Sequence, residues 1–456
     1  SGVEMARLFM SLDQQTQDDA GGWYDNPDRF QGRLVVDNAS AKRRARFSVV
    51  APALQDQGYR SGIRFGLEDE STRLNLNTVL VADEKVENGA RQILMGLPGM
   101  TEDIADAILD WIDPDNEPRE YGAEADHYAF LDPPYTPKNG PLETIEELLL
   151  VRGVTPWLLF GSDANRNGVI DRDEPSADMI EGVDNVEGAM DSGWSSYLTL
   201  YSLELNLRPE GQLRIDVNQE DLEKLYDELE EAVGGQWATF IVAYRQSGGY
   251  TGTEPGELAA TGQLDLSKPG RVKLDTILDL IGPRVKVKFK GDDKDTILET
   301  PFPELPGVMG AYLLIMMDHL TVNASPIIPG RININQATRT VLAGIPGMTD
   351  EILEEVLTRR QKDPVDRLPG RRHETWILGE GIVTLEEMKS LIPFVCGGGA
   401  VFRAQWIGYF DEEGPSARIE AILDATTRPA RVLFWRDMSH LGRGYPLETL
   451  GIELDY

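Results

Sequence analysis

Alternating apolar and polar residues predict two groups of β-strands, one near each end of the chain. The predicted strands are residues 33–36, 46–51, 63–67, 401–409, 417–424 and 431–435. Successive side chains on a strand point to opposite faces, so this alternation is typical of strands with one buried face. Glu413, Gly414 and Pro415 form a turn signal between two late strands, which predicts a terminal antiparallel sheet.

Helical spacing of apolar residues predominates between the two groups of strands. Residues 1–18 also read as a helix, and others are predicted to end at Trp111 and to cover residues 142–151 and 155–160. Shorter stretches with β character, residues 197–207, 284–290 and 296–300, interrupt this middle region. Two β regions that flank a mostly helical middle predict an α+β fold in which a large insertion interrupts one domain.

A short internal repeat organises the middle of the chain. Its three copies, residues 74–77, 213–218 and 332–335, each place Asn after alternating apolar residues and precede a helical segment. The first and third copies lead into nearly the same sequence, at residues 97–101 and 345–349. Because Asn at a strand-to-helix junction can cap the helix that follows, we interpret the repeat as structural.

One segment matches the twelve-residue calcium loop at every position. Its predicted oxygen ligands are Asp163, Asn165, Asn167, the Val169 carbonyl, Asp171 and Glu174, and Gly168 stands at the position of the sharp turn. A hard cation with six to eight oxygen ligands needs this spacing to be enclosed by one short loop. Pro175 follows directly, with no strong exit helix, so we expect a structural clamp rather than a calcium sensor. The alternative is an acidic, solvated turn.

A second acidic stretch runs from Asp110 to Asp126. Pro114, Pro118 and Gly122 prevent a regular helix, so the carboxylates lie on an irregular loop that could fold around an ion. The spacing follows no fixed loop formula. The residues alone therefore leave calcium binding and a plain acidic loop equally open.

The charge of the chain is strongly acidic. Asp and Glu number 77 against 44 Lys and Arg, which gives a net charge of −33. Such a surface repels phosphate backbones and anionic lipid headgroups, and it favours divalent cations where carboxylates converge. We therefore expect no nucleic acid partner. Residues 97–101 and 345–349 do resemble the helix–hairpin–helix element, but acidic residues follow both hairpins.

Catalytic and transition-metal signatures are absent from the sequence. The histidines stand singly, at His127, His319, His373 and His440, without a second ligand at zinc spacing. No nucleophile elbow, phosphate-binding loop or dinucleotide fingerprint is present, so we predict that the chain is not an enzyme. Cys396 is the single cysteine and is expected to be a small buried residue. The longest apolar run, residues 311–317, is far shorter than the roughly 20 residues of a membrane span.

Several of these motifs together resemble the minor pseudopilin K family of type II secretion, also called general secretion pathway protein K. The matching stretches are residues 74–77, 97–101, 105–115, 122–124, 141–154 and 332–337, of which Asp-Trp-Ile-Asp at 110–113 is the most specific. The resemblance covers residues 1–160 and 330–456. It implies a pseudopilin fold, in which an N-terminal helix packs on a small antiparallel sheet and a large helical domain with helix–hairpin–helix or SAM-like repeats is inserted.

The family also implies partners, a location and a cofactor. Its members sit at the pseudopilus tip with minor pseudopilins I and J, at the periplasmic face of the inner membrane, and they face the secretin channel and exported substrates. A single-pass anchor that precedes the first helix would explain why this sequence starts inside a helical pattern. Because family members bind calcium through acidic loops, the resemblance favours calcium at Asp113, Asp115, Glu117, Glu124 and Asp126.

The predicted division of the chain follows from these observations. It comprises residues 1–75 (helix and first strands), 76–160 (first part of the insertion), 161–330 (added module with the calcium loop and the middle repeat), 331–398 (last repeat) and 399–456 (terminal strands). Two other classes of function stay open. An extracellular adhesive or carbohydrate-binding module would be expected to carry two calcium loops, and a hydrolase would need an acidic pair in a cleft.

Overall fold

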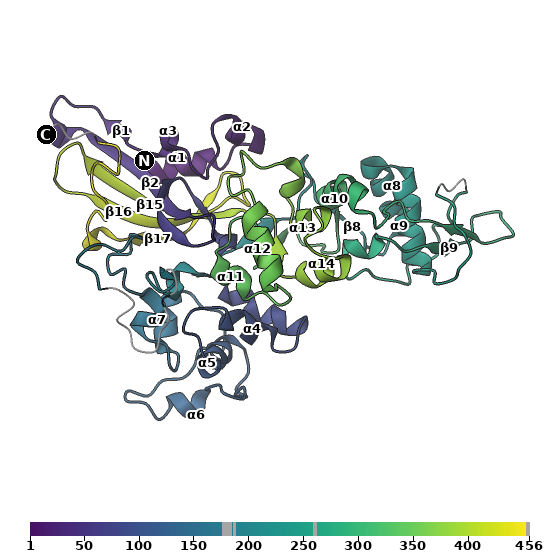
Figure 1. Cartoon of the computed structure of the whole chain (residues 1–456), viewed down its shortest axis with the longest axis horizontal. Helices are drawn as coiled ribbons and strands as arrows, with labels where there is room; N and C mark the ends of the chain where they lie inside the picture. Colours follow the sequence, from purple (N-terminus) through teal and green to yellow (C-terminus); the bar gives the residue numbers. More distant parts are fainter. Residues whose placement is uncertain (176–184, 186–187, 259–261, 453–456) are drawn as a thin grey trace. The chain divides into compact units, whose positions relative to one another are not determined.

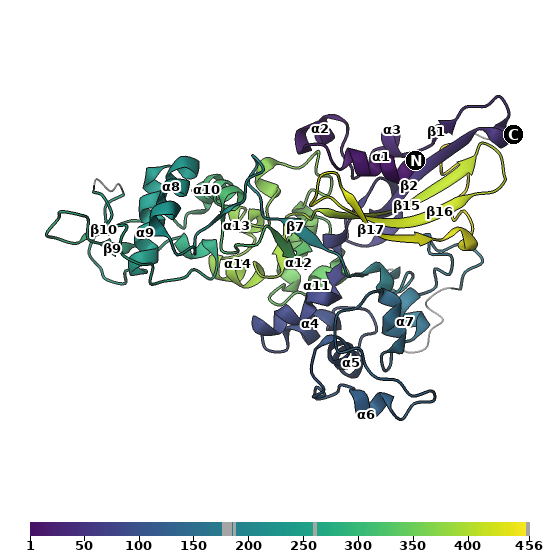
Figure 2. The same ribbon diagram turned by 180° about the vertical axis from the view of Figure 1, so that it is seen from behind.

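The computed structural model describes residues 1–175, 185, 188–258 and 262–452, and these form two compact units. Unit 1 contains Ser1–Glu204, Pro329–Leu368 and Pro393–Tyr456, and unit 2 contains Leu205–Ile328 and Pro369–Ile392. Figures 1 and 2 show the elements from two opposite sides. The five-part division predicted from the sequence stays a prediction.

The sheet of unit 1 joins strands from both ends of the chain. Its strands are β1 (Arg33–Val36), β2 (Ala45–Leu54), β3 (Arg60–Phe65), β4 (Glu68–Asp69), β15 (Val401–Phe410), β16 (Ala417–Asp424) and β17 (Arg431–Asp437). The order is β1-β2-β15-β16-β17, β3 pairs with β2, β4 pairs with β15, and every pairing is antiparallel. The predicted α+β class, with early and late strands around a helical middle, is therefore confirmed.

Both faces of this sheet are covered by segments from the chain ends. Helix α1 (Gly2–Phe9) buries Val3, Ala6 and Phe9 against side chains such as Trp406. On the other face, residues 445–452 pack against a second apolar cluster built on β2 and β15. The alternation of side chains along each strand thus supplies two apolar surfaces, one for each covering segment.

The predicted helix over residues 1–18 is wrong in its extent. The chain instead forms α1, α2 (Gln14–Asp19) and α3 (Pro27–Phe30). The break between α1 and α2 has a local cause, because the Asp13 carboxylate accepts the Thr16 N–H at 2.9 Å and so caps a new helix.

Short helices and strand pairs make up the rest of unit 1. They are β5 (Leu74–Asn75), α4 (Gly89–Met95), α5 (Glu102–Ile112), α6 (Ala125–Tyr128), α7 (Pro156–Phe160), β6 (Leu198–Thr199), β13 (Ile332–Asn333), α11 (Arg339–Ala343), α12 (Asp350–Arg359) and β14 (Val395–Cys396), together with 3-10 helices at Ala41–Arg43, Glu70–Thr72, Leu76–Glu84, Ile145–Leu150, Trp194–Ser196 and Ser439–Leu441. Cys396 is fully buried, as expected.

Two predicted elements of unit 1 are shorter than expected. The helix predicted over residues 142–151 is a 3-10 helix, Ile145–Leu150, which Thr144 and Glu147 close with a capping box. The strand predicted over residues 197–207 is interrupted after Thr199, whose hydroxyl accepts the Tyr201 N–H at 3.1 Å. This side-chain bond turns the backbone away from the strand path.

The described part of unit 2 contains five α-helices, two 3-10 helices and two short strand pairs. Its elements are β8 (Ile215–Asp216), α8 (Leu222–Val233), α9 (Gly235–Ser247), a 3-10 helix (Ile277–Leu280), β9 (Val285–Val287), β10 (Thr296–Leu298), α10 (Pro306–His319), β11 (Leu320–Thr321), a 3-10 helix (Pro369–Arg371), α13 (Trp376–Gly379) and α14 (Leu385–Leu391). Strands β9 and β10 pair antiparallel, at two of the stretches with predicted β character. The chain crosses from unit 1 to unit 2 within strand β7 (Leu203–Leu205) and returns within strand β12 (Ile327–Pro329).

The three copies of the internal repeat share one local geometry. Each contains a two-residue strand in a parallel pair: β5 with β6, β8 with β11 and β13 with β14. In each, the side chain of the second residue accepts a backbone N–H two residues later, at 3.1 Å from Asn75, 2.8 Å from Asp216 and 3.0 Å from Asn333. These polar residues therefore set the turn that follows each strand. The helix–hairpin–helix character of the repeats stays a prediction.

The helices α4 and α11, which follow the first and third copies of the repeat, end at Gly96 and Gly344, and the backbones of these two glycines are in contact. A Cβ on Gly96 would lie 2.6 Å from the Gly344 Cα, closer than atoms can approach. We expect Gly96→Ala to lower the free energy of unfolding by about 2 kcal/mol, because the two backbones would have to separate. Gly307→Ala, in α10, is the matched control and should be neutral or slightly stabilising, since nothing lies near its Cβ. Equal effects of the two changes in urea unfolding would contradict a tight contact.

Candidate metal centres

Loop 163–174 folds around the carboxylate of Asp163. Asp163 is buried, and its two oxygens accept the N–H groups of Asn167 at 3.0 Å and of Gly168 at 2.7 Å. Gly168 has a φ of +77°, a conformation that favours glycine. Burial raises the pKa of the Asp163 carboxyl, and the two N–H donors oppose that rise. The sharp turn predicted at Gly168 is therefore present.

The other predicted ligands of this loop converge on one another. The Asp171 carboxylate accepts the side-chain amides of Asn165 at 2.7 Å and of Asn167 at 3.1 Å. The Glu174 carboxylate accepts the backbone N–H groups of Asn165 at 3.1 Å and of Asp171 at 3.0 Å.

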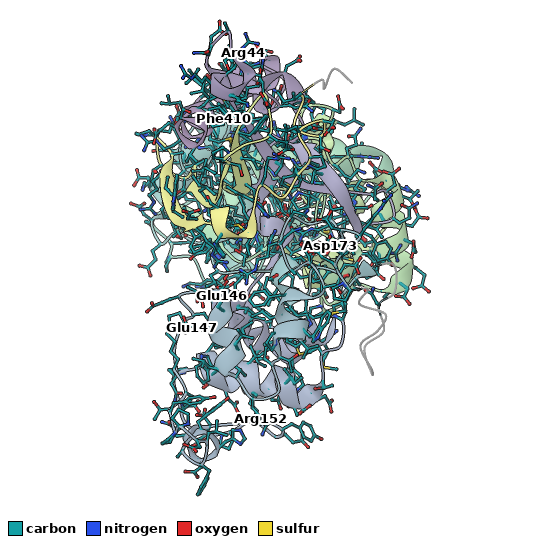
Figure 3. The ribbon with its side chains drawn as sticks, turned by 90° about the vertical axis from the view of Figure 1, so that its left-hand side faces the viewer. Arg44, Glu146, Glu147, Arg152, Asp173 and Phe410 are labelled. Atoms are coloured by element: carbon teal, nitrogen blue, oxygen red, sulfur yellow. The ribbon has the colours of Figure 1, made fainter. Side chains whose placement is uncertain are left out.

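One ligand of this loop keeps an unsatisfied oxygen. Asn165 Oδ1 is buried without a hydrogen-bond partner, and Val169 lies in the same turn, with its N–H 2.7 Å from Asn167 Oδ1. Arg172 and Asp173 of the loop are exposed, and Asp173 is labelled in Figure 3. Residues 176–184, where the absence of an exit helix was expected, lie outside the described residues.

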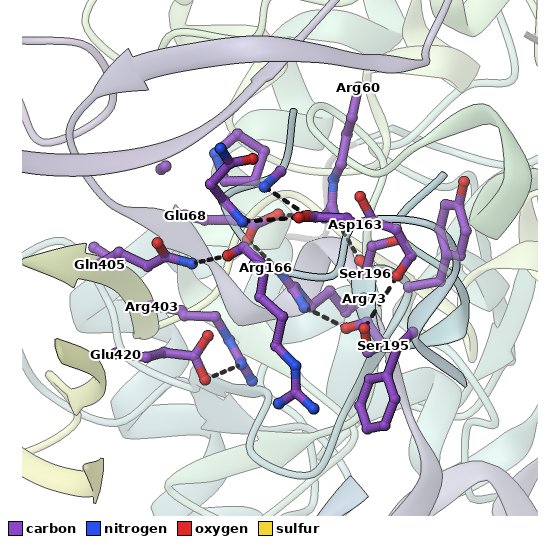
Figure 4. Close-up of a pocket in the computed structure, with 18 of the residues that line it drawn as sticks. Arg60, Glu68, Arg73, Asp163, Arg166, Ser195, Ser196, Arg403, Gln405 and Glu420 are labelled. Atoms are coloured by element: carbon purple, nitrogen blue, oxygen red, sulfur yellow. Dashed lines mark hydrogen bonds and ion pairs between the residues drawn. The ribbon is translucent and has the colours of Figure 1, made fainter. Parts of the chain in front are cut away.

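Side chains from the sheet of unit 1 and from Tyr445 form hydrogen bonds to the backbone of loop 163–174. Arg418, on β16, is fully buried and donates to the carbonyls of Asn165, at 2.8 Å, and of Arg166. Gln405, on β15, donates to the Arg166 carbonyl at 2.8 Å, and the Tyr445 hydroxyl donates to the Asn167 carbonyl at 2.7 Å. Figure 4 shows the bond between Gln405 and Arg166. Three distant parts of the sequence therefore fix the loop.

A second carboxylate cluster joins the end of α5 to the start of α6. Asp113 follows α5, Glu124 precedes α6, and Asp115 lies on the loop between them. Each of the three residues offers an oxygen within 4.8 Å of the others, and Asp113 and Glu124 are buried. Glu117 and Asp126, which were also predicted as ligands, are exposed and are not part of this group of three.

The charge of this cluster is only partly compensated, by Arg119, whose Nε lies 3.9 Å from Asp113 Oδ2. Asp113 Oδ1 and both carboxylate oxygens of Glu124 have no hydrogen-bond partner. Burial, together with the nearby Asp115 and Asp110, raises the pKa of Asp113 to about 6. Burial, Asp110 and Asp113 raise the pKa of Glu124 to about 7. Such a group is costly at neutral pH unless a cation accompanies it.

Two further residues shape this site: Asp110, which begins the predicted acidic stretch but was not among the predicted ligands, and Asp106, which sequence reasoning missed. Asp110 is fully buried and accepts the Arg119 N–H at 3.2 Å, and a Cβ on Gly122 would lie 1.8 Å from its Oδ2. Asp106 is also fully buried and receives both Nε and Nη2 of Arg91 at 2.6 Å. The spacing of Asp106, Asp110 and Asp113, four and then three residues apart, places them on one helix face and was the available signal.

This chain is similar to known proteins of type II secretion. The family model described as type II secretion system (T2SS), protein K, matches residues 72–159. The type II secretion system protein K of Pseudomonas aeruginosa is 36% identical over 98 residues, which is 20% of this chain and 29% of that protein. The structure of the GspK-GspI-GspJ complex from the type 2 secretion system of enterotoxigenic Escherichia coli aligns with 96% of this chain and 92% of that chain, at 10% identity and a TM-score of 0.35.

These findings confirm the predicted resemblance to protein K of type II secretion. The match to the Pseudomonas protein spans less than a third of that protein's length. The cluster of Asp113, Asp115 and Glu124 lies inside the segment matched by the family model, whereas loop 163–174 lies outside it. Among the described residues, no helix is both long and apolar enough to cross a membrane.

Proposed function

We propose that this chain is a non-enzymatic structural component of the type II secretion pseudopilus tip, where it assembles with minor pseudopilins I and J and is stabilised by calcium. The observation that carries the proposal is the protein K match over residues 72–159, a segment that contains the Asp113–Asp115–Glu124 cluster. A head that faces the periplasm, with an anchor in the inner membrane, is the location that agrees with this function. Under this proposal, the exported substrates and the secretin channel are further partners.

Calcium fits both acidic sites by the chemistry of their donors. A hard cation takes six to eight oxygen ligands, from carboxylates, amide and backbone carbonyls, and water. Loop 163–174 would hold it through Asp163, Asn165, Asn167, Val169, Asp171 and Glu174. The second cluster would hold it through Asp113, Asp115 and Glu124, with Glu117 on the same loop and Asp126 in the first turn of α6. The unpartnered buried oxygens of Asn165, Asp113 and Glu124 support this fit.

The role of the ion would be mechanical. In loop 163–174 it would replace bonds that the ligand side chains now make to one another, and in the cluster it would neutralise carboxylates that repel. Both effects favour the folded state, because a ligand stabilises the state to which it binds preferentially. The ordered loops would then present one fixed surface to the partner pseudopilins.

Assembly tests the proposed function directly. We expect this chain, mixed with the periplasmic domains of minor pseudopilins I and J in calcium, to co-elute with both in size-exclusion chromatography. Asp163→Ala combined with Glu174→Ala should lower both the thermal stability and the yield of the complex, because it removes two ligands of one loop. Lys42→Ala, at an exposed residue, is the control. Absence of a complex with the unaltered chain would contradict the proposed function, and an unaffected double variant would contradict only the structural role of the loop.

A further inference from the structure

An exposed apolar loop follows helix α6, which Figures 1 and 2 show at the outer end of unit 1. This loop, residues 129–134, is called the Phe130 loop below. All six of its residues are exposed, and apart from Asp132 they are apolar. Phe130 is 90% exposed, the largest exposed fraction of any large apolar side chain that the structure describes, and Leu131 is 37% exposed. Because surface apolar residues are normally scattered singly, such a run marks a surface that is covered by something else.

The backbone of the Phe130 loop is fixed at its base by Tyr128. The Tyr128 carbonyl accepts the N–H groups of Leu131 and Tyr135, each at 3.3 Å. The Tyr128 ring is fully buried and lies 5.3 Å from the Tyr135 ring, centre to centre. The Tyr135 hydroxyl donates in turn to the Leu150 carbonyl at 2.7 Å. Phe130 is therefore presented on a preformed turn, which reduces the entropy that binding would cost.

The charge around the Phe130 loop is almost entirely negative. Residues 113–132 contain seven Asp and Glu residues against one basic residue, Arg119. The guanidinium of Arg119 already pairs with Asp83, at 3.1 Å. Asp126 and Asp132, the carboxylates nearest to Phe130 in the sequence, are exposed, and neither forms an ion pair within the part of the chain that the structure describes. The negative charge beside the loop is thus left uncompensated by the chain itself.

This combination of an apolar loop and unpaired carboxylates decides what covers it. Anionic lipid headgroups would be repelled by the carboxylates, which disfavours a membrane surface. A second copy of the chain has the same net charge of −33 and would be repelled as well. An aromatic side chain with an acidic border is complementary to an apolar pocket bordered by Lys or Arg.

We propose that the Phe130 loop docks into a partner protein, with Phe130 and Leu131 in an apolar pocket of the partner whose rim is basic. Asp126 and Asp132 face that rim. Phe130 supplies the contact area, because a few buried anchors dominate the affinity of an interface. The carboxylates speed the encounter and set its orientation, as complementary charge does. The contact rests on exposure and charge alone, so it does not depend on the calcium sites or on the function proposed above.

A basic amphipathic peptide is the probe for this chemistry. The peptide KLLKKLLKKLLKKLL, acetylated and amidated, presents an apolar stripe with a Lys border when it is helical. One counterpart replaces every Lys by Glu, and the other replaces every Leu by Gln. In isothermal titration calorimetry on the full chain, in about 0.15 M salt, we expect the Lys–Leu peptide to bind at least about tenfold more tightly than either counterpart. Equal affinity with either counterpart, or no binding up to about 1 mM, would overturn the proposal.

Substitutions then locate the binding on the chain. Phe130→Ser should weaken the Lys–Leu peptide about tenfold and leave the melting temperature unchanged, because the side chain is exposed. Leu305→Ser, at a residue that is 58% exposed in unit 2, is the matched control and should not change peptide binding. Asp126→Asn combined with Asp132→Asn should weaken binding and reduce its dependence on salt. Unchanged affinity of the Phe130→Ser variant would place the peptide elsewhere and overturn the assignment.

Two further measurements test the other occupants of the Phe130 loop. Binding to phosphatidylcholine vesicles that Phe130→Ser abolishes would mean that a bilayer covers the loop. Self-association in sedimentation velocity that the same substitution abolishes would mean that a second copy covers it. Either result would overturn the proposal, and we expect no difference between Phe130→Ser and the unaltered chain in either measurement.

Discussion

Glu124→Gln is expected to stabilise the protein when calcium is removed and to destabilise it relative to the unaltered chain when calcium is present. Both Glu124 oxygens are buried without partners and lie near Asp113 and Asp110, so the ionised carboxylate is costly. A neutral amide of the same shape removes this cost, which is about 3 kcal/mol above pH 7 for a pKa raised from 4.5 to about 7. At the proposed calcium site the carboxylate would be a ligand, and its loss would remove stabilisation of about 4 kcal/mol at a thousandfold excess over Kd.

Thermal unfolding at about pH 8, first in EDTA and then in millimolar calcium, measures both halves of this result. The two melting curves of the variant should lie closer together than those of the unaltered chain, and the separation that remains should come from loop 163–174. Glu87→Gln changes an exposed carboxylate of the same segment and should follow the unaltered chain in both conditions. A Glu124→Gln effect with the same sign in EDTA and in calcium would argue against calcium at this cluster.

The pH dependence of stability checks the direction of the Glu124→Gln effect in EDTA. Because the folded-state pKa of Glu124 is raised, the folded protein binds more protons than the unfolded chain between about pH 4.5 and 7. The contribution of this group to stability is therefore fully present below about pH 4.5 and is lost as the pH rises through 7. The stabilisation that Glu124→Gln gives in EDTA should accordingly be largest above pH 7 and disappear in acid. Asp113, with a pKa of about 6, adds to the same trend.

Features with a local cause could be predicted from the sequence. The strand groups at both ends could be found because alternation is a property of neighbouring residues, and loop 163–174 because its ligand spacing is fixed within twelve positions. The break at Asp13 and the interruption at Thr199 are also local, but a single side chain competes there with a longer apolar pattern. Such competition decides where helices and strands end, and the spacing of apolar residues alone does not locate these ends well.

Contacts between distant residues could not be predicted in the same way. Asp113, Asp115 and Glu124 were among the predicted ligands, but their convergence depends on α6 folding back beside the end of α5. Asp110 lies on the helix before them, and only the structure shows that Gly122 makes room for its carboxylate. The attachment of loop 163–174 to residues more than 200 positions later has no trace in the spacing of the loop itself.

Arg418→Met is expected to be among the most destabilising single changes in unit 1. The Arg418 side chain is fully buried and donates to the carbonyls of Asn165 and Arg166 and, at 2.9 Å, to Gln405 Oε1. Burial lowers the pKa of its guanidinium, and the nearby Tyr445 and Asp163 partly oppose that shift. Methionine fills a similar volume but leaves the acceptors without donors, so we expect a loss of about 3 kcal/mol in the free energy of unfolding.

Urea unfolding of the full chain, measured with and without calcium, separates the loss of the Arg418 hydrogen bonds from a general loss of positive charge. Lys42→Met removes the same charge from an exposed pair with Glu412 and should cost less than about 1 kcal/mol. Because Arg418 fixes the backbone between Asn165 and Arg166, its loss should also weaken calcium binding at loop 163–174, while the response that depends on Glu124 persists. The two sites would then be lost independently, by Arg418→Met and by Glu124→Gln. A calcium response that Arg418→Met leaves intact would mean that the loop holds its shape without the sheet.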